Sequence, residues 1–491
     1  MTDKKWFENM EAKIPRGGVR TRFAPSPTGY MHVGGLRTAL YAYLIAKKDG
    51  GAFILRIEDT DTARFVEGAT EIIIKTLNEA GLRYDEGPDT GGPAGPYTQS
   101  ERIGLYRPYA ELLCEKGDAY YCFCSKGDQP EGENAFNQTD DPCRGLPYEE
   151  SLARVKAGEA HVVRQKIPRE GETTIRDMVF GVITTQNKTL DDMVLLKSDG
   201  MPTYNFANVI DDHLMGITHV MRGSEYISSA PKYNLLYEAL GWEIPAYITV
   251  SPVMRDAQNK LSKRHGDPTY DDLLREGYLP DAVLNFVALL GWSPGGERER
   301  FTLPELVEVF DVSGISKSPA IFDTEKLKYF NSEYLRALTP EKFAEIALPY
   351  IREAVKNEAY PVGALASILQ ARCEKLSDIP EKIDFFDVLP DYSAELYVHK
   401  KSKTDETISL GVLTDALSAL DSVPEWTAEA IHDAFLHLAE TRAVKNATIM
   451  WPVRIAVSGK AVTPGGAVEI CLILGRGETL RRIGAGIEKL R

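Results

Sequence analysis

Hydrophobic and polar positions form a strand–helix–strand pattern near the start of the chain. A short apolar run ends at Ala24, and apolar or small residues then recur at helical spacing from Val33 to Lys48. The pair Gly50–Gly51 stops this helix, and the apolar stretch 52–57 predicts a second strand. The pattern therefore predicts a βαβ unit of a parallel sheet, in which ligands bind at the carboxyl ends of the strands.

Strand and helix patterns continue to alternate up to residue 338. The predicted helices are 70–80, one starting at 99, one opening near 202, 231–240 and 281–291; the predicted strands are 160–166, 177–184, one starting at 193, one ending at 222, and 247–250. Residues 1–17 are polar and end in glycine, so we expect a loose arm. The glycine- and proline-rich run 87–96 predicts an ordered loop.

From Thr339 onwards the pattern is helical only. Thr339 is a predicted N-cap with Pro340 at the first helical position. Further helices are predicted at 361–376, 410–420, 427–441 and 468–474, the last one stopped by Gly475. Residues 455–457 have strand propensity. This part of the chain predicts an all-α domain.

The composition is that of a large acidic globular protein. The 491 residues exceed what one hydrophobic core holds, so two to four domains are expected. No apolar run reaches the roughly 18 residues of a membrane span. Few cysteines and no apolar signal segment predict a cytoplasmic protein without membrane contact. The net charge of −15 disfavours a general nucleic-acid binder, although a local basic stripe can hold RNA.

Two stretches far apart in the sequence carry the candidate chemistry. The loop 25–32 is rich in proline and glycine and places His32 at a helix N-terminus, where a phosphate can bind. Gly34 and Gly35 leave room for a flat base against the backbone. The basic run 260–266 suits the pyrophosphate of a nucleotide. Each stretch alone would be read as an ordinary turn or a solvated basic surface, but together they indicate nucleotide chemistry.

The first stretch resembles the HIGH signature of class I aminoacyl-tRNA synthetases, and the second resembles their KMSKS signature. The form Pro25-Ser-Pro-Thr-Gly followed by His32-Val-Gly-Gly is similar to that of the bacterial glutamyl-tRNA synthetase family in particular. Gly35 stands where the general signature has a second histidine, as is common in this family. The resemblance is nearly continuous from Arg22 to Gly266 and implies ATP and Mg²⁺ as cofactors.

The resemblance also implies the residues of the site. His32, Lys260 and Lys263 would be catalytic, stabilising the phosphoryl oxygens and the departing pyrophosphate. The expected ATP-binding residues are Ser26, His32, Gly34, Gly35, Lys260, Leu261, Ser262, Lys263 and Arg264. The expected glutamate-binding residues are Arg22, Ala24, Ser26, Glu58, Tyr204, Asn208 and Arg222, with Glu58 at the α-ammonium group.

Three of these residues match the family's positions for the side-chain carboxylate of glutamate: Arg22, Tyr204 and Arg222. A carboxylate only accepts hydrogen bonds, so arginine donors satisfy it fully, whereas glutamine would turn its NH₂ group toward them. Such a mismatch can be rejected by a factor of about 10⁴. The pocket chemistry therefore favours glutamate over glutamine. Asn208 is four residues after Tyr204, so on a helix both share one face.

The predicted fold class is an α/β Rossmann-like catalytic domain with an inserted mixed α/β acceptor-binding domain, followed by helical stem-contact and all-α anticodon-binding domains. The expected boundaries are 18–105 and 195–253 for the two halves of the catalytic domain, 106–194 for the insertion, 254–338 for the stem-contact domain with the KMSKS-like loop, and 339–491 for the anticodon-binding domain. The resemblance is weaker after 339, where it favours helix at 455–457. A helical dimerisation or scaffold domain is the alternative for this part.

Cys122, Cys124 and Cys143 resemble a zinc knuckle, because thiolates at Cys-x-Cys spacing suit tetrahedral zinc. Zinc-bearing relatives have a fourth ligand just after the last cysteine or a tyrosine four residues before it. Gly145 and Thr139 occupy those places here. The sequence therefore favours reduced structural cysteines over a zinc site.

The resemblance implies a monomeric ligase that activates L-glutamate with ATP and esterifies tRNA(Glu). A non-discriminating enzyme that also charges tRNA(Gln) is left open. A non-catalytic RNA-binding relative would be expected to lose His32, Lys260 or Lys263, and all three are present. A tRNA-independent relative would lack the helical part after Thr339, and a glutaminyl-tRNA synthetase would not place two arginines at the pocket. A Rossmann dehydrogenase is disfavoured because no G-x-G-x-x-G follows the first strand.

Overall fold

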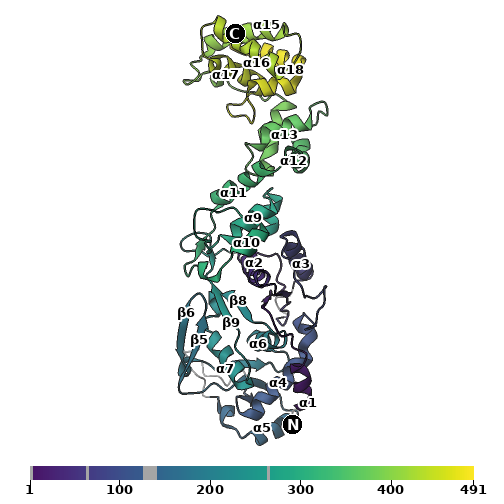
Figure 1. Ribbon diagram of the computed structural model, residues 1–491, viewed down its shortest axis with the longest axis vertical. Coiled ribbons are helices and arrows are strands. Elements are labelled where there is room, and N and C mark those ends of the chain that lie inside the picture. The colour runs from purple at the N-terminus through teal and green to yellow at the C-terminus, as the bar shows by residue number, and fades with distance from the viewer. Residues whose placement is uncertain (1–3, 62–65, 125–140, 262–265) are drawn as a thin grey trace. The chain divides into compact units, whose positions relative to one another are not determined.

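The computed structural model describes residues 4–61, 66–124, 141–261 and 266–491. The chain forms two compact units (Figure 1), Met1–Asp272 with Val283–Asp323 and Leu273–Ala282 with Thr324–Arg491, called unit 1 and unit 2 here. In the described ranges, every helix is too short or too polar to cross a membrane.

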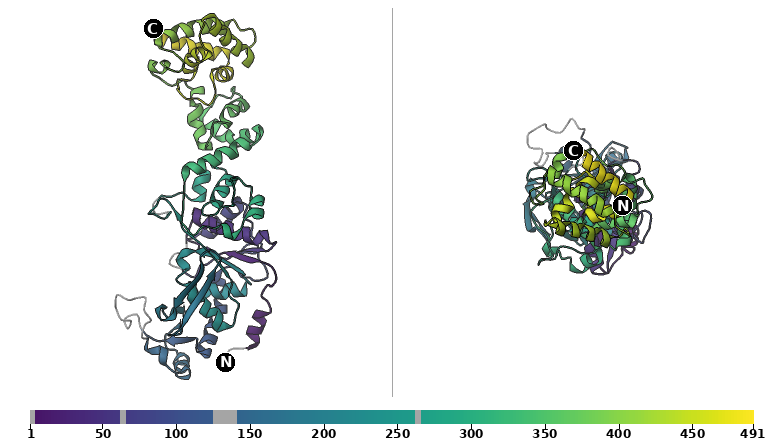
Figure 2. Two further views of the ribbon diagram at one scale, coloured as in Figure 1. Left: turned by 60° about the vertical axis from the view of Figure 1, so that its left-hand side comes forward. Right: turned by 90° about the horizontal axis from the view of Figure 1, so that it is seen from above.

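Unit 1 is built on a six-stranded sheet with the order β2-β1-β8-β9-β5-β6. Strands of this unit are drawn as arrows in purple to teal in Figure 2. The strands of the sheet are β1 (Arg20–Phe23), β2 (Ala52–Leu55), β5 (Glu172–Asp177), β6 (Gly181–Gln186), β8 (His219–Gly223) and β9 (Ala246–Val250). Neighbouring strands are parallel except β5 and β6. Because the chain goes from β1 to β2 on one side and β8 lies on the other, the strand order reverses at β1. A crevice therefore opens beyond the carboxyl end of β1.

Several helices of unit 1 lie close to the predicted positions. The helices are α2 (Val33–Lys48), α3 (Ala69–Glu79), α4 (Ile103–Lys116), α5 (Tyr148–Lys156), α6 (Tyr204–Leu214), α7 (Ala230–Leu240) and α10 (Leu303–Val309), while α8 (Tyr270–Arg275) and α9 (Pro280–Ala288) run across the sequence boundaries of the two units. Helices α5, α8 and α10 had not been predicted. Helix α2 packs on β1, β2 and β8 through residues such as Leu36, Leu40 and Leu44, which are fully buried. The apolar spacing that predicted this helix thus reflects its contact with the sheet.

The inserted part differs from the sequence prediction in its strands. β3 (Ala119–Cys122), β4 (Val162–Gln165) and β7 (Val194–Leu196) form a separate antiparallel sheet. The strand predicted at 177–184 is wrong, because a turn interrupts it and creates the hairpin β5–β6, which joins the large sheet. The Asp177 carboxylate accepts hydrogen bonds from the backbone N–H groups of Val179 and Phe180 at 2.8 Å, and Gly181 has a φ of 84°. These local bonds fix the turn.

The N-terminal arm is helical, contrary to the prediction of a loose segment. Helix α1 (Lys4–Glu11) places the rings of Trp6 and Phe7 against Tyr109, with ring centroids 5.6 and 5.0 Å apart. Glu11 pairs with His213 at 2.6 Å. Aromatic packing onto α4, invisible in the local sequence pattern, orders this segment.

In the described residues of unit 2, the regular secondary structure is helical. Its helices are α11 (Thr324–Ala337), α12 (Pro340–Ala354), α13 (Val362–Gln370), α14 (Ile379–Ile383), α15 (Glu406–Asp421), α16 (Ala428–Thr441), α17 (Asn446–Ser458) and α18 (Ala467–Leu490). Residues 455–457 lie inside α17, so tertiary packing overrides their strand propensity. Gly475 has a φ of 77° and breaks α18 where a stop was predicted, but the helix resumes. One buried cluster, from Leu335 to Ile487, forms the core.

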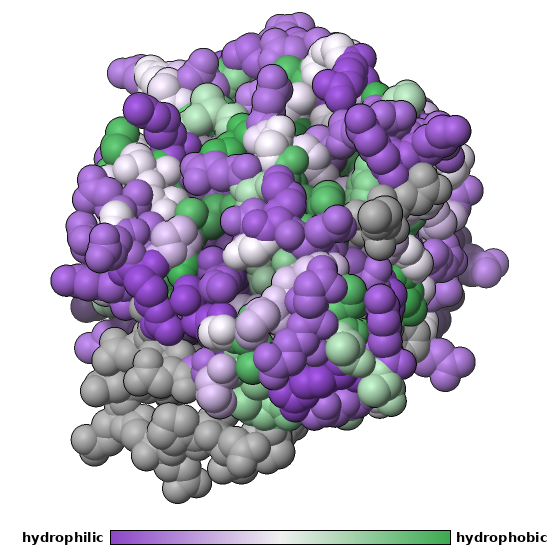
Figure 3. Space-filling view, turned by 90° about the horizontal axis from the view of Figure 1, so that it is seen from below, coloured by the Kyte–Doolittle hydropathy of each residue, from purple (hydrophilic) through white to green (hydrophobic). Residues whose placement is uncertain are grey.

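The surface is mainly polar on one face of the molecule (Figure 3). The face drawn in Figure 3 is mostly hydrophilic, with hydrophobic residues in small scattered groups. Single apolar residues are ordinary on protein surfaces.

Candidate active site

A cavity of about 660 Å³ lies beyond the carboxyl ends of β1, β2 and β8, at the crevice where the strand order reverses. It brings together segments separated by more than two hundred residues in the sequence. The predicted site residues that line it are Arg22, Ala24, Ser26, His32, Gly34, Gly35, Glu58, Tyr204, Arg222, Lys260 and Leu261. Ser262, Lys263 and Arg264 lie outside the described residues.

His32 is the N-cap of α2. Its Nδ1 accepts a hydrogen bond from the backbone N–H of Gly35 at 3.0 Å. Because Nδ1 accepts, the neutral ring carries its proton on Nε2 and can donate it to a ligand. A Cβ atom at Gly34 would lie 3.0 Å from the His32 ring, so this glycine leaves room for the ring itself. Histidine and helix N-terminus together form a donor site for an anion.

Lys260 enters the same cavity from a short turn. The Asp256 carboxylate accepts hydrogen bonds from the backbone N–H groups of Gln258 and Asn259, both at 2.9 Å. Lys260 then pairs with Met254 in an isolated β-bridge. The Asp256 carboxylate accepts hydrogen bonds from the Asn259 side chain and from these backbone N–H groups, and they lower its pKa to about 2. Asp256 therefore remains a carboxylate that fixes the turn. The turn thereby positions the start of the basic run at the cavity.

Arg222 is a buried cation whose donors are incompletely used. Its Nε and Nη1 atoms have no hydrogen-bond partner among the described residues. The guanidinium lies 4.9 Å from the ring centroids of both Tyr233 and Tyr247, two neutral neighbours. Because an unpaired buried charge is costly, this arginine is arranged to receive an anion.

Arg22 differs from Arg222 because it is already paired. It donates from Nε and Nη2 to the two oxygens of Asp212, at 2.9 and 3.2 Å, and from Nη1 to the Met221 carbonyl. Asp212 also pairs with Arg56 at 2.8 Å. Although burial opposes it, Arg22 and Arg56 hold the pKa of Asp212 below its usual range. Arg22 therefore supports the wall of the cavity with most of its donors engaged.

The buried charges beside the cavity do not balance. Among the five buried charged residues grouped around Asp212, the three positive ones are Arg22, Arg56 and Arg222 and the two negative ones are Glu58 and Asp212, so this group carries one positive charge in excess. Arg56 donates to Glu58 at 3.0 Å. Burial raises the pKa of Glu58, and the Arg56 guanidinium acts against this shift. The excess positive charge favours an anionic ligand.

Tyr204 adds a neutral donor. Burial raises its pKa well above the usual value, so the hydroxyl keeps its proton at neutral pH. Its ring lies 5.4 Å from that of Tyr226, which also lines the cavity. Asn208 does not line the cavity; its amide nitrogen donates to the Tyr204 and Asn205 carbonyls within α6. Tyr204 and Asn208 are neighbours on α6, as their spacing predicted. The Asn208 side chain, however, hydrogen-bonds to backbone carbonyls of its own helix and does not face the cavity.

Sequence reasoning missed the central role of Asp212 and the contributions of Glu225 and Tyr226. Asp212 is eight residues after Tyr204 on α6, so helical periodicity could have placed it on the same face. Glu225 and Tyr226 directly follow β8, the strand that carries Arg222. Their position at a strand end was the available signal.

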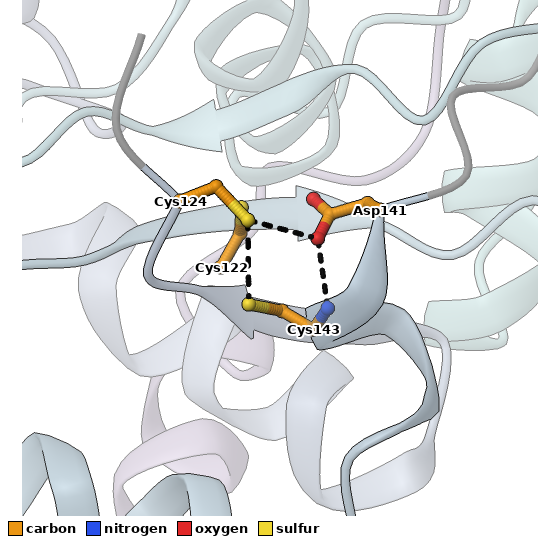
Figure 4. Close-up of side chains that lie close together, drawn as sticks. All are labelled: Cys122, Cys124, Asp141 and Cys143. Carbon is orange, nitrogen blue, oxygen red and sulfur yellow. Dashed lines mark hydrogen bonds between the residues drawn. The ribbon is translucent and has the colours of Figure 1, made fainter. Parts of the chain in front are cut away.

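A second cluster lies in the inserted part (Figure 4). The structure brings Cys122, Cys124 and Cys143 together with Asp141, and one ligand atom from each lies within 4.8 Å of all the others. The sequence analysis had not identified Asp141.

The fold, with its nucleotide-type crevice, and the two signature stretches at one cavity define a class I aminoacyl-tRNA synthetase. Residues 18–329 match the family model for tRNA synthetases class I (E and Q), catalytic domain, and residues 342–487 match that for an anticodon binding domain. The chain belongs to the glutamyl-tRNA synthetase family within this class.

Relatives support this membership over nearly the full length. The chain is 55% identical over 479 residues to glutamate–tRNA ligase from Clostridium tetani, covering 96% of this chain and 98% of that one. The same ligase from Clostridium novyi matches at 55% with the same coverage. The structure is similar to that of a glutamate tRNA ligase from Elizabethkingia meningosepticum in complex with its amino acid, with a TM-score of 0.88, 36% identity, and coverage of 97% and 100% of the two chains. It is also similar to glutamate-tRNA synthetase from Elizabethkingia anophelis, with a TM-score of 0.85, 35% identity, and coverage of 96% and 100%.

Proposed function

We propose that this chain is a glutamate–tRNA ligase. It activates L-glutamate with ATP to glutamyl-adenylate, releasing pyrophosphate, and transfers the glutamyl group to the 3′-terminal adenosine of tRNA(Glu), releasing AMP. The observation that carries the proposal is the buried Arg222, with two unused donors at a cavity that also holds the nucleotide signature. Membership of the family supplies the reaction class.

Glutamate binds with its γ-carboxylate on Arg222. Two guanidinium nitrogens, Nε and Nη1, lack partners among the described residues, and the protonated Tyr204 hydroxyl can also donate, which matches a group that only accepts. Bound glutamate carries a net negative charge and neutralises the excess positive charge of the pocket. Glutamine carries none and would turn N–H donors toward Arg222. The α-ammonium group is assigned to Glu58, whose carboxylate lines the cavity.

ATP binds at the N-terminus of α2. His32 donates from Nε2 to the phosphoryl oxygens, and Gly34 and Gly35 admit the nucleotide close to the backbone. The α-carboxylate of glutamate attacks the α-phosphorus in line, so the protein contributes mainly positioning and charge stabilisation. Lys260 and Lys263 neutralise the departing pyrophosphate. Mg²⁺ bound to ATP would shield the phosphate charges beside His32 and Lys260.

The tRNA extends over several parts of the chain. We assign the insertion 106–194 to the acceptor end, residues 254–338 to the stem and residues 339–491 to the anticodon. The match of residues 342–487 to an anticodon binding domain supports the last assignment. Whether glutamate is also attached to tRNA(Gln) depends on contacts in this helical part.

The experiment is aminoacylation of purified tRNA(Glu) and tRNA(Gln) with labelled glutamate, with labelled glutamine in parallel reactions. Glutamate attached to tRNA(Glu) alone is expected for a discriminating enzyme. Glutamate attached to both tRNAs would identify a non-discriminating enzyme. No label on either tRNA, from protein that binds glutamate and ATP, would overturn the ligase proposal.

A further inference from the structure

Arg37 is a buried arginine of the cavity wall that the proposed reaction does not use. It lies on α2, five residues after His32, and only 4% of the residue is exposed. Nη1 and Nη2 donate to carbonyl oxygens, and Nε has no hydrogen-bond partner among the described residues. Burial lowers the pKa of Arg37, although an arginine keeps its charge at neutral pH. A charge held by neutral carbonyls is costly, so this arginine is expected to do more than fill space.

The guanidinium of Arg37 joins two segments that are far apart in the sequence. Nη1 donates to the Leu290 carbonyl at 2.9 Å, and Nη2 donates to the Ser251 carbonyl. Leu290 lies two residues after α9, and Ser251 directly follows β9. Because the donors of a planar guanidinium point in fixed directions, Arg37 holds the two carbonyls at a set separation. It thereby ties α2 to the end of β9.

The segment that begins at Ser251 leads to Lys260. Two residues after Ser251 comes the short strand β10 (Val253–Met254). The carbonyl of its first residue accepts a hydrogen bond from the backbone N–H of Leu261 at 3.1 Å, and its second residue pairs with Lys260 in the isolated β-bridge. A shift of the Ser251 carbonyl is therefore expected to shift Lys260 as well.

The other end of this connection is the phosphate site at the N-terminus of α2. His32 caps this helix and presents its Nε2 to the cavity that Lys260 also lines. A Cβ atom at Gly34 would lie 4.0 Å from Cγ2 of Val253, so the first turn of α2 comes close to β10. Arg37 thus lies between the two donors that the proposed reaction places on the phosphates of ATP.

Tyr41, one turn further along α2, provides a contrast to Arg37. It is fully buried and does not line the cavity. Its hydroxyl lies 2.9 Å from the Ala288 carbonyl and 3.1 Å from the Leu290 carbonyl. Both carbonyls lie at the end of α9, whereas Arg37 also bonds the Ser251 carbonyl. Removing the Tyr41 hydroxyl therefore perturbs one side of the connection and leaves the other intact.

We propose that Arg37 is a positioning residue for the nucleotide step, because it fixes the start of the Lys260 segment against the helix that carries His32. This inference rests on the proposed function, in which Lys260 neutralises the departing pyrophosphate. Loss of the guanidinium should lower kcat rather than raise the KM for ATP, since ATP keeps its donors at the N-terminus of α2. The KM for glutamate should also stay constant, since Arg222 lies on β8.

Hydrogen exchange of the full-length chain without substrates tests the connection itself. In R37M, the backbone amides of residues 251–261 should exchange at least about tenfold faster than in the wild type, because local opening becomes easier. R37K should show a smaller increase, since one ammonium group cannot hold both carbonyls in the same way. Y41F should leave this segment unchanged. Circular dichroism identifies variants that do not fold, and R37K keeps the test decisive if R37M is one of them. Unchanged exchange over 251–261 in the folded Arg37 variants would overturn the inference, whether or not the chain charges tRNA.

Charging of tRNA(Glu) with labelled glutamate tests the effect on the reaction. R37M should lower kcat by about 10- to 100-fold with the KM for ATP within about threefold of the wild-type value, and Y41F should behave like the wild type. In the K260A background, R37M should lower kcat by less than about threefold, because the group through which Arg37 acts is already absent.

Three kinetic results would overturn the positioning role of Arg37. They are a full R37M defect added to that of K260A, a raised KM for ATP with kcat unchanged, and equal losses of kcat in R37M and Y41F. An inactive wild-type chain would instead overturn the proposed function, and the exchange measurement separates this outcome from a failure of the Arg37 connection.

Discussion

Arg222 and Arg22 are both buried arginines at the cavity wall, but they differ in how many of their donors are hydrogen-bonded. Arg22 is engaged by Asp212 and a carbonyl, whereas two donors of Arg222 lack partners among the described residues. Because an arginine held by a carboxylate cannot turn freely to a ligand, we propose Arg222 rather than Arg22 as the main receptor for the γ-carboxylate. Sequence alone gave the two residues equal standing.

Replacing Arg222 should therefore damage glutamate recognition specifically. In R222Q, kcat/KM for glutamate in tRNA charging should fall by about 10²- to 10³-fold, because a buried charge pair with the substrate is lost. R176Q, which changes an exposed arginine on β5, should behave like the wild type. Equal kcat/KM values for R222Q and the wild type would remove Arg222 from the glutamate site.

Asp212 acts on stability as well as on the pocket. In D212N, Arg22 and Arg56 lose their shared buried carboxylate, so the free energy of unfolding of unit 1 should fall by about 3 kcal/mol. D49N, at the exposed end of α2, is the matched control and should change stability little. Urea unfolding monitored by fluorescence measures the free energy of unfolding of D212N and D49N. A D212N midpoint identical to that of the wild type would contradict the ionic network.

The sequence predicts the residue types of the site better than their pairing. Ligand-facing positions such as Glu58 and Arg222 follow from strand ends, since parallel strands deliver their carboxyl ends to one edge. Asp212 was missed because its role depends on its ion pairs with Arg22 and Arg56, which only the folded chain brings beside it. Asp141 was missed because its place beside the three cysteines depends on how the short helix Pro142–Gly145 packs against β3.

At the level of elements, strong periodicity was a reliable guide. Helix α2 begins and ends where the apolar spacing predicted, at Val33 and Lys48. The failures have tertiary causes: α1 is ordered by aromatic contacts with α4, and 455–457 are helical because α17 packs on α18 and α15. The hairpin β5–β6 was predicted as one strand because its turn depends on side-chain bonds from Asp177.

Helix α18 is anchored by one buried residue, Arg482. It donates to the carbonyls of Phe385, Phe386 and Val457 and pairs with Glu478 at 2.6 Å. R482M would leave three carbonyls and a carboxylate without this donor, so unit 2 should lose about 3–5 kcal/mol of unfolding free energy.

Its neighbour Arg481 is the natural control for this prediction. Arg481 is exposed and bonds to Glu478 only through its side chain, so R481M should cost less than about 1 kcal/mol. Chemical denaturation, monitored through the helical circular dichroism signal, compares the free energies of unfolding of R481M and R482M. Equal losses in R481M and R482M would contradict the anchoring role.

For the whole molecule, the described buried clusters divide between the two units. The cluster from Leu335 to Ile487 belongs to unit 2, and the clusters around Phe206 and Tyr247 belong to unit 1. Separate cores predict separate unfolding steps, since multidomain chains depart from two-state behaviour. D212N should shift one transition and R482M the other, as measured by calorimetry of the full chain. A single transition that both variants shift together would contradict separate cores.

We propose that an excess buried positive charge at Arg222 selects glutamate over glutamine. The direct measurement is the ratio of kcat/KM values for glutamate and glutamine in charging of tRNA(Glu) by the wild-type chain at saturating ATP. The expected ratio is about 10⁴ in favour of glutamate, because glutamine leaves the pocket charge unneutralised and directs N–H donors at an arginine. Comparable values for the two amino acids would contradict it.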